Sequence, residues 1–233
     1  MLHGNKNFSE IAASNLIKIM PHYIRSLIAR GEHLHLDFKF EVSDARKIAA
    51  SFSAFANSSG GKLLIGVKDN GALAGVNTEE ELYMIESAAS YYCSPMVTFS
   101  ARRHTVDGKT ILEVDIPEGR QKPYRVKEKN GPPQAYIRIG DKNIKACNVQ
   151  LMVWKKHRQP SGLLIADTED KSRLLHFPEI HTAISFGAVC KLLPASRRKA
   201  EELLADLVYL DILEIEYADG KVFFRKKERP EGK

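Results

Sequence analysis

The stretch from Gly31 to Gly75 constrains the fold more than any other, because three element patterns follow one another in it. From His33 to Glu41 apolar and polar residues alternate, which predicts a half-buried strand. A stripe of small and aromatic residues from Ala45 to Ala56 predicts a helix. The apolar run from Leu63 to Val67 is typical of a strand in the middle of a sheet. The stretch therefore predicts a strand–helix–strand unit.

The residues around this unit predict a mixed α/β domain over residues 1–158. Further helices are expected at Asn7–Arg30, where Pro21 interrupts the pattern, at Thr78–Cys93 and at Cys147–Arg158. Further strands are expected at 97–105, 110–116 and 135–139, with a hairpin turn between the first two. We expect a mixed sheet that is partly covered by helices.

Residues 159–171 are predicted to form a linker, and the pattern changes beyond them. Helical patterns at His181–Leu193 and Arg197–Leu210 are followed by two strand patterns, at Ile212–Tyr217 and Val222–Lys226. A helix, a tight turn, a longer helix and a hairpin are the layout of a winged helix-turn-helix. We therefore expect a small winged-helix domain at 172–228 and a disordered tail at 229–233.

The composition narrows the classes of function and the cellular location. The net charge of +6 favours a polyanionic partner mildly. The three cysteines lie far apart, which is typical of reduced thiols in a cytoplasmic protein. No apolar run is long enough to span a membrane, and the N-terminus lacks the pattern of a signal peptide. We expect a cytoplasmic protein without a membrane partner.

Four motifs resemble the AlbA-type domain of the schlafen family: LDFKF, SAFANSSGGKLLIGVKDNGALAGV, PYRV and AYIRIGDKNIKA. The resemblance covers about residues 30–150 and is specific between Ala54 and Gly75. Asp37 replaces the usual glutamate of E-F-K, and Asn143-Ile144-Lys145-Ala146 stands where the family often carries a threonine. The resemblance implies DNA binding and transcriptional regulation, as bacterial members are described. It also implies a homodimer, because schlafens pair two related lobes.

The same resemblance implies a metal-dependent alternative. Animal schlafens with ribonuclease activity carry three carboxylates at positions that match Glu32, Asp37 and Asp69, where Mg²⁺ or Mn²⁺ would support phosphoryl transfer. Glu32 and Asp37 are five residues apart, so they share a face only if Glu32 lies in the loop before the strand. Solvated strand ends and a turn are the plainer explanation of these residues.

ATP, which an older classification of the family implies, is not expected. The chain has no G-x-x-x-x-G-K-[ST] sequence, and Gly60-Gly61 precede a strand instead of a helix.

Candidate nucleic-acid-binding residues are basic and aromatic side chains in both parts of the chain. In the first part they would neutralise phosphates or stack on bases, and in the second they lie in the presumed recognition helix and wing. They are Lys39, Arg102, Arg103, Lys122, Tyr124, Arg125, Arg138, Lys142, Arg197, Arg198, Lys199 and Lys221. Glu201, Glu202 and Asp206 lie on the same presumed helix and would repel phosphate.

The sequence thus predicts a nucleic-acid-binding protein whose partner is DNA or RNA, and first of all a DNA-binding transcriptional regulator. One alternative is a metal-dependent endoribonuclease in which Glu32, Asp37 and Asp69 are the metal-binding and catalytic residues. The other is a protein-interaction adaptor that binds no nucleic acid. No cofactor is assigned outside the ribonuclease alternative, to which Mg²⁺ or Mn²⁺ belongs.

Overall fold

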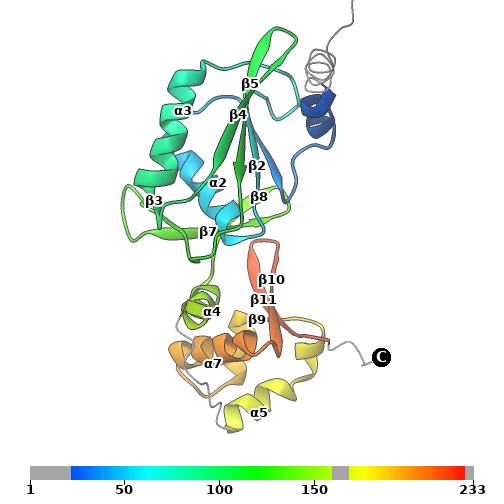
Figure 1. Cartoon of the computed structure of the whole chain (residues 1–233). Helices are drawn as coiled ribbons and strands as arrows, with labels where there is room; N and C mark the ends of the chain where they lie inside the picture. Colours follow the sequence, from blue (N-terminus) through cyan, green and yellow to red (C-terminus); the bar gives the residue numbers. More distant parts are fainter. Residues whose placement is uncertain (1–21, 159–167, 229–233) are drawn as a thin grey trace, which may run out of the picture. The chain divides into compact units, whose positions relative to one another are not determined.

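The computed structural model describes residues 22–158 and 168–228 (Figure 1). The chain divides into two compact units. The first unit comprises the described residues up to 120 together with Tyr124–Asn143, and the second comprises Gln121–Pro123 and the described residues from Ile144 on. The disordered tail expected at 229–233, the helix expected before residue 22 and most of the expected linker lie outside the described residues.

The first unit contains two four-stranded sheets. One has the order β1-β2-β5-β4, in which β1 and β2 are parallel and the other neighbours are antiparallel. The other has the order β3-β6-β7-β8. The strands are β1 (Leu36–Lys39), β2 (Gly61–Ile65), β3 (Cys93–Ser94), β4 (Ser100–Val106), β5 (Lys109–Ile116), β6 (Arg125–Val126), β7 (Gln134–Ile139) and β8 (Lys142–Lys145). A mixed sheet with covering helices confirms the expected α/β class.

Helix α2 (Ala45–Asn57) connects the parallel strands β1 and β2 and forms the centre of the unit. Asp44 caps its first turn, where the carboxylate accepts a hydrogen bond from the Arg46 N–H. Ten of its thirteen residues are buried, so the helix has almost no free face. Its apolar side chains share one core with β2, β5 and β6 and with the following helix, α3 (Thr78–Ser87), which continues as the π-helical turn η1 (Ala88–Tyr92).

Strand β1 is shorter than the alternating pattern predicts and is buried on both faces. Leu36 and Phe38 pack under the helical residues 22–29, whereas Leu34 and Phe40, predicted on the same buried face, are exposed. Asp37, predicted on a solvated face, is only 3% exposed. The alternation gave the strand correctly, but it could not reveal that a second layer covers the polar face.

The helical residues 22–29 are held to the first sheet by polar contacts as well as by apolar packing. The Tyr23 hydroxyl donates to Glu113 Oε1 (2.8 Å), and Lys62 Nζ lies 2.9 Å from the same atom. His104 Nε2 lies 2.8 Å from the other oxygen of Glu113. Burial alone would raise the pKa of Glu113, but the bonds from Lys62, Tyr23 and His104 outweigh it and lower that pKa.

The second unit contains four helices and a three-stranded antiparallel sheet with the order β10-β11-β9. Its elements are α4 (Asn148–Arg158), α5 (Glu169–Leu175), the 3₁₀ turn η2 (Pro178–His181), β9 (Ile184–Ser185), α6 (Phe186–Leu192), α7 (Arg197–Tyr209), β10 (Leu213–Ala218) and β11 (Lys221–Lys226). The predicted helix at His181–Leu193 therefore begins later, at Phe186. Ser185 ends the preceding strand and caps α6 through its hydroxyl, which accepts from the Ala188 N–H.

Helix α4 was expected to end the first domain, but its apolar side chains belong to the second core. Val149 and Val153 pack with Leu204, Leu207 and Phe224. Residues 169–171, at the end of the expected linker, form the first turn of α5. None of the described helices is long and apolar enough to cross a membrane.

Gly60, in the turn between α2 and β2, is a position where we expect a substitution by alanine to destabilise the protein. Gly60 has φ +75°, and a Cβ there would lie 2.9 Å from both Glu118 N and Ile116 O. Gly108 has a similar φ of +72° but no atom within 4 Å of such a Cβ. We expect Gly108→Ala to cost about 1 kcal/mol and Gly60→Ala about 2 to 4 kcal/mol of unfolding free energy, because only the latter adds a backbone clash. Urea unfolding of both variants measures the difference, and equal losses would contradict the close contact.

Candidate functional site

The acidic corner, defined here as Glu32 and Asp37, lies where β1 meets α2. Ser51 Oγ of α2 donates to Asp37 Oδ2 at 3.1 Å, and Lys39 Nζ lies 2.9 Å from the same oxygen. An Arg138 nitrogen of β7 lies 3.5 Å from Asp37 Oδ1. The Asp37 carboxylate is therefore surrounded by two cations and a hydroxyl of the protein itself.

Arg138 was predicted to contact nucleic acid, and the structure corrects this. The residue is 2% exposed. Its guanidinium donates to Leu36 O (3.1 Å), to His33 O (3.3 Å) and to Asn143 Oδ1 (3.0 Å), and it lies over the Phe55 ring. A long cationic side chain on a strand is usually exposed, but here it joins β7 to the backbone before β1. Arg138 therefore has a structural role and cannot reach a phosphate.

Glu32 lies before β1, as the sequence argument required, and its carboxylate approaches Asp37. Glu32 Oε1 accepts the Phe38 N–H at 2.8 Å. Burial raises the pKa of Glu32, and the hydrogen bond with Asp37 raises it further. Burial alone would also raise the pKa of Asp37, but the hydrogen bond with Glu32 and the charges of Lys39 and Arg138 lower it below its ordinary value. Asp37 is therefore the ionised member of the pair, and Glu32 is the member that takes up a proton first.

The residues of the acidic corner do not fit a hard divalent cation. Asp69 is exposed in the turn after β2, and within the described ranges no group of three His, Cys, Asp or Glu side chains is arranged to hold a metal ion. Mg²⁺ and Mn²⁺ require oxygen ligands that are free to coordinate. Lys39, Ser51 and Arg138 already occupy the oxygens of Asp37. The geometry gives the ribonuclease alternative no support.

The motif SAFANSSGG acts as a latch between α2 and the second sheet. Asn57 Nδ2 donates to Tyr124 O (2.8 Å) and Tyr136 O (2.9 Å), and Asn57 Oδ1 accepts the Tyr124 N–H (2.8 Å). Ser53 Oγ donates to Tyr124 O and accepts the Tyr136 N–H. Ser58 Oγ accepts the Arg138 N–H. These side chains satisfy the backbone of Tyr124, just before β6, and of β7, and they are not free to bind a ligand.

Tyr124 was predicted to stack on bases, and this prediction is wrong. The residue is 8% exposed and belongs to the core around α2. Its ring lies so close to Gly119 that a Cβ on this glycine would come within 2.1 Å of it. A ring enclosed in this way has no face for a base.

The other basic candidates between residues 39 and 142 differ in exposure. Arg102 and Arg103 are exposed on β4, which is an edge strand, and Lys142 is exposed on β8. Lys122 and Arg125 are half-buried. Lys39 is engaged by Asp37 and by its bond to Phe38 O. Arg102, Arg103 and Lys142 are thus the candidates of this group that a phosphate can reach most easily.

In the second unit the basic candidates of α7 and β11 lie on the surface. The side chains of Arg197 and Arg198, in the first turn of α7, are 75% and 85% exposed. Lys199, in the same turn, and Lys221, at the start of β11, are exposed too. Arg198 Nε donates to Glu202 at 3.0 Å, and Arg197 Nε lies 3.5 Å from Glu201, both within the same helix. These pairs on the protein surface are weak, so a phosphate can compete for the arginines.

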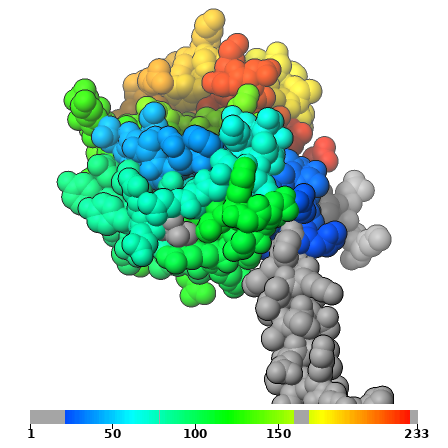
Figure 2. Space-filling model, turned by 90° about the horizontal axis from the view of Figure 1, so that it is seen from above, coloured from blue at the N-terminus to red at the C-terminus, as the bar shows by residue number. Residues whose placement is uncertain are grey.

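Sequence reasoning missed an aromatic surface on α3 and η1. Tyr83 and Tyr91 are 70% and 61% exposed. Lys127 Nζ lies 4.2 Å from the centre of the Tyr91 ring, and Arg46 of α2 lies over the ring of Tyr92. Figure 2 shows turquoise atoms of this region beside light-blue atoms of α2 on one face. The tyrosines at 83, 91 and 92 are visible in the sequence. The helical pattern of this stretch, however, did not predict which of their rings would be exposed.

Substitutions in the acidic corner test its structural role. Asp37→Asn is expected to lower the unfolding free energy at pH 7 by about 2 to 4 kcal/mol, because Lys39 and Arg138 lose their charged partner. Because the pKa of Asp37 is lowered in the folded protein, the ionised carboxylate adds to the unfolding free energy above the ordinary pKa of 3.8. This added stability is lost as the pH falls below that value. Urea unfolding from pH 7 down to pH 3 measures both effects.

Glu32→Gln is the matched control, since it keeps the acceptor for the Phe38 N–H. The pKa of Glu32 is raised, so its ionisation opposes folding once the pH exceeds the ordinary value of 4.5. At pH 7 this variant is expected to be at least as stable as the wild type. Equal destabilisation by both substitutions would contradict the assignment of the charge to Asp37.

Divalent cations test the fit of the acidic corner directly. Millimolar Mg²⁺ or Mn²⁺ is expected to leave the Tm unchanged, because a metal stabilises a protein only when it binds the folded state preferentially. Thermal unfolding of the wild type, Asp69→Ala and Asp141→Ala provides the measurement, with the exposed Asp141 of the β7–β8 turn as control. A saturable rise in Tm that Asp69→Ala alone abolishes would establish a metal site.

Comparison with known proteins adds an independent finding. Residues 32–147 match the family described as Schlafen, AlbA_2. The structure is similar to a crystal structure of the DIP2311 protein from Corynebacterium diphtheriae (TM-score 0.44, 18% identity), over 65% of this chain and 30% of that one. It is also similar to a solution structure of the N-terminal domain of a Nitrosomonas europaea protein named as related to the ATP-dependent DNA helicase RecG (TM-score 0.39, 25% identity), over 51% of this chain and 90% of that one.

Each of these matches covers only part of this chain. The chain spans less than a third of the length of the Corynebacterium protein. A comparison with curated proteins gave no match. The matched family range begins at Glu32, includes the latch of Ser53 and Asn57, and ends at Cys147, so it covers the elements from β1 to β8. Residues 32–147 are therefore similar to the Schlafen AlbA_2 family.

Proposed function

We propose that the chain is a nucleic-acid-binding protein that binds DNA through its second unit and acts as a transcriptional regulator. The observation that carries the proposal is the group of three exposed cations, Arg197, Arg198 and Lys199, in the first turn of α7. The first turn of a recognition helix is the part that reaches base edges and phosphates. The family of residues 32–147 is consistent with this role.

The arrangement of the second unit supports a winged helix-turn-helix. A short strand, β9, precedes the helix pair α6 and α7, and the hairpin β10–β11 follows, with β11 next to β9 in the sheet. In this arrangement α7 is the recognition helix, and the turn from Ala218 to Lys221 is the tip of the wing. Lys221 then extends the basic surface that α7 begins.

The acidic side chains of α7 set the strength of binding. Glu201 is only 8% exposed, so its charge faces the protein more than the DNA. Glu202 is exposed and pairs with Arg198. Because a surface pair of this kind contributes less than about 1 kcal/mol, a phosphate can displace Glu202 at small cost. We infer moderate, strongly salt-dependent binding.

The first unit would add a second contact surface and the means of dimerisation. Arg102 and Arg103 lie on the edge strand β4, and Tyr83 and Tyr91 expose rings on which bases can stack. The homodimer that the resemblance implies belongs to this proposal, because two copies of α7 would bind two half-sites. A protein partner on the aromatic surface remains the alternative if no nucleic acid binds.

Salt-titrated binding to duplex DNA tests the proposal. The double substitution Arg198→Ala and Lys199→Ala is expected to weaken binding and to reduce the slope of log K against log salt by about two, one per lost phosphate contact. Arg173→Ala on α5 is the matched control, because Arg173 is an exposed arginine that pairs with Glu169 four residues away, as Arg198 pairs with Glu202.

The outcomes of this titration separate the functions. Loss of binding in the α7 variant alone supports DNA recognition by α7. Equal losses of DNA affinity in both variants would contradict recognition by α7 and would indicate unspecific attraction of DNA by the net charge. Absence of binding to duplex DNA and to structured RNA at low salt would overturn it in favour of the adaptor alternative.

A further inference from the structure

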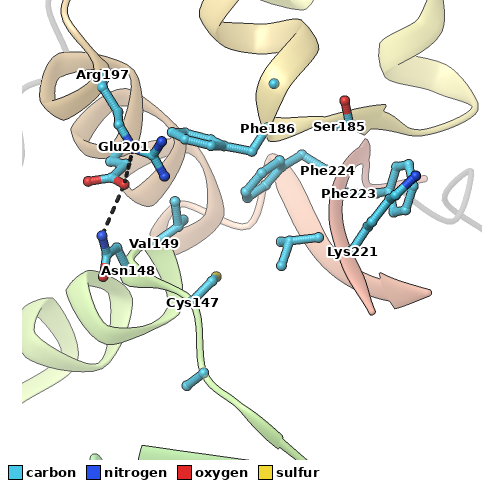
Figure 3. A pocket seen from close by; sticks show the side chains of 13 residues that line it. Cys147, Asn148, Val149, Ser185, Phe186, Arg197, Glu201, Lys221, Phe223 and Phe224 are labelled. Atoms are coloured by element: carbon cyan, nitrogen blue, oxygen red, sulfur yellow. Dashed lines mark hydrogen bonds and ion pairs between the residues drawn. The ribbon is translucent and has the colours of Figure 1, made fainter. Parts of the chain in front are cut away.

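A hollow of about 690 Å³ lies within the second unit, between the starts of α4, α6 and α7 and the strand β11 (Figure 3). This volume falls in the range of about 300 to 1,000 Å³ that is typical of small-molecule sites. The proposed DNA contacts do not require such a hollow. All the residues that line the hollow belong to the second unit.

The wall of the hollow is apolar and in part aromatic. Phe224 and Val149 line it and are buried in the core of the unit, which fixes their positions. Phe186, the first residue of α6, lines it as well, and Figure 3 labels both phenylalanines in the wall. A flat apolar body would replace water against these rings.

The charges around the hollow favour an anion. Arg197 and Lys221 line it together with a single carboxylate, that of Glu201. Glu201 Oε1 already accepts a bond from Asn148 Nδ2 (3.1 Å), and Arg197 Nε lies 3.5 Å away. Among the described residues Lys221 has no ion-pair partner. One positive charge is thus left over at the hollow.

The starts of two helices also favour an anion in the hollow. Helix α4 begins at Asn148 and α7 begins at Arg197, and both residues line the hollow. The first turn of a helix carries unpaired N–H groups and a partial positive charge. The Arg197 guanidinium also lies 4.9 Å from the centre of the Phe186 ring, so a cation is already held beside the aromatic wall.

We propose that this hollow binds a small organic monoanion with a flat apolar body, such as an aromatic carboxylate. The body lies against Phe186 and Phe224, and the anionic group is bound by Arg197. Arg197 also belongs to the proposed DNA surface, so the anion and DNA would compete for it. This competition rests on the proposed function, whereas the binding of the anion does not.

A fluorescent anilinonaphthalene sulfonate, which is an aromatic monoanion, serves as the probe for the full-length chain. Saturable binding at one site with displacement by benzoate is expected. Gly187→Leu should abolish it, because Gly187 lines the hollow and a Cβ there would meet only Ser185 Oγ, at 4.0 Å. The added side chain therefore fills the hollow without disturbing the core, and an unchanged Tm verifies this.

Arg197→Gln and Arg198→Gln form a matched pair. Both remove one exposed arginine from the first turn of α7, but only Arg197 lines the hollow. Arg197→Gln is expected to weaken probe binding about fivefold, as one partly exposed charged contact would, and Arg198→Gln should leave it unchanged. Equal effects of the two substitutions, unchanged binding in Gly187→Leu, or no saturable binding of the probe would each overturn the proposal. None of these results depends on whether the chain binds DNA.

Discussion

The burial of α2 is the constraint on which the first unit depends. A helix that is covered on nearly every side must satisfy its polar groups inside the protein, because an unpaired buried group costs about 1 to 3 kcal/mol. Ser51, Ser53 and Asn57 are buried, and all three are bonded: Ser51 to the Asp37 carboxylate, and Ser53 and Asn57 both to the backbone of Tyr124 and Tyr136. Polar residues in the middle of the motif thus specify how two sheets pack around one helix.

This constraint also accounts for the acidic corner. Once α2 covers the polar face of β1, the Asp37 carboxylate can remain charged only with partners beside it. Lys39 and Arg138 are those partners, and Arg138 in turn satisfies the carbonyls of His33 and Leu36. A cluster that looks catalytic in sequence is then a buried ionic network, and the proposed nucleic-acid surface lies elsewhere, on α7.

Local patterns predicted the elements but not their surroundings. The strand–helix–strand unit, the β4–β5 hairpin and the helix pair of the second unit follow from periodicity and turn residues, and the α/β class follows from them. The burial of Tyr124 and Arg138 could not be predicted, because it depends on elements far away in the chain. The same holds for α4, whose apolar side chains pack in the second core. The hollow beside Arg197 arises from three helix ends and a strand, which no local pattern brings together.

Hydrogen–deuterium exchange of the full chain, with and without duplex DNA, tests most directly whether the acidic corner is structural and DNA is bound by the second unit. The account predicts added protection in the first turn of α7, at Arg197–Lys199, and at the β10–β11 turn. It predicts slow exchange around Asp37 that DNA leaves unchanged, since this part of β1 is already buried and bonded. Protection that appears at Glu32–Lys39 on addition of DNA, with none at α7, would contradict the account.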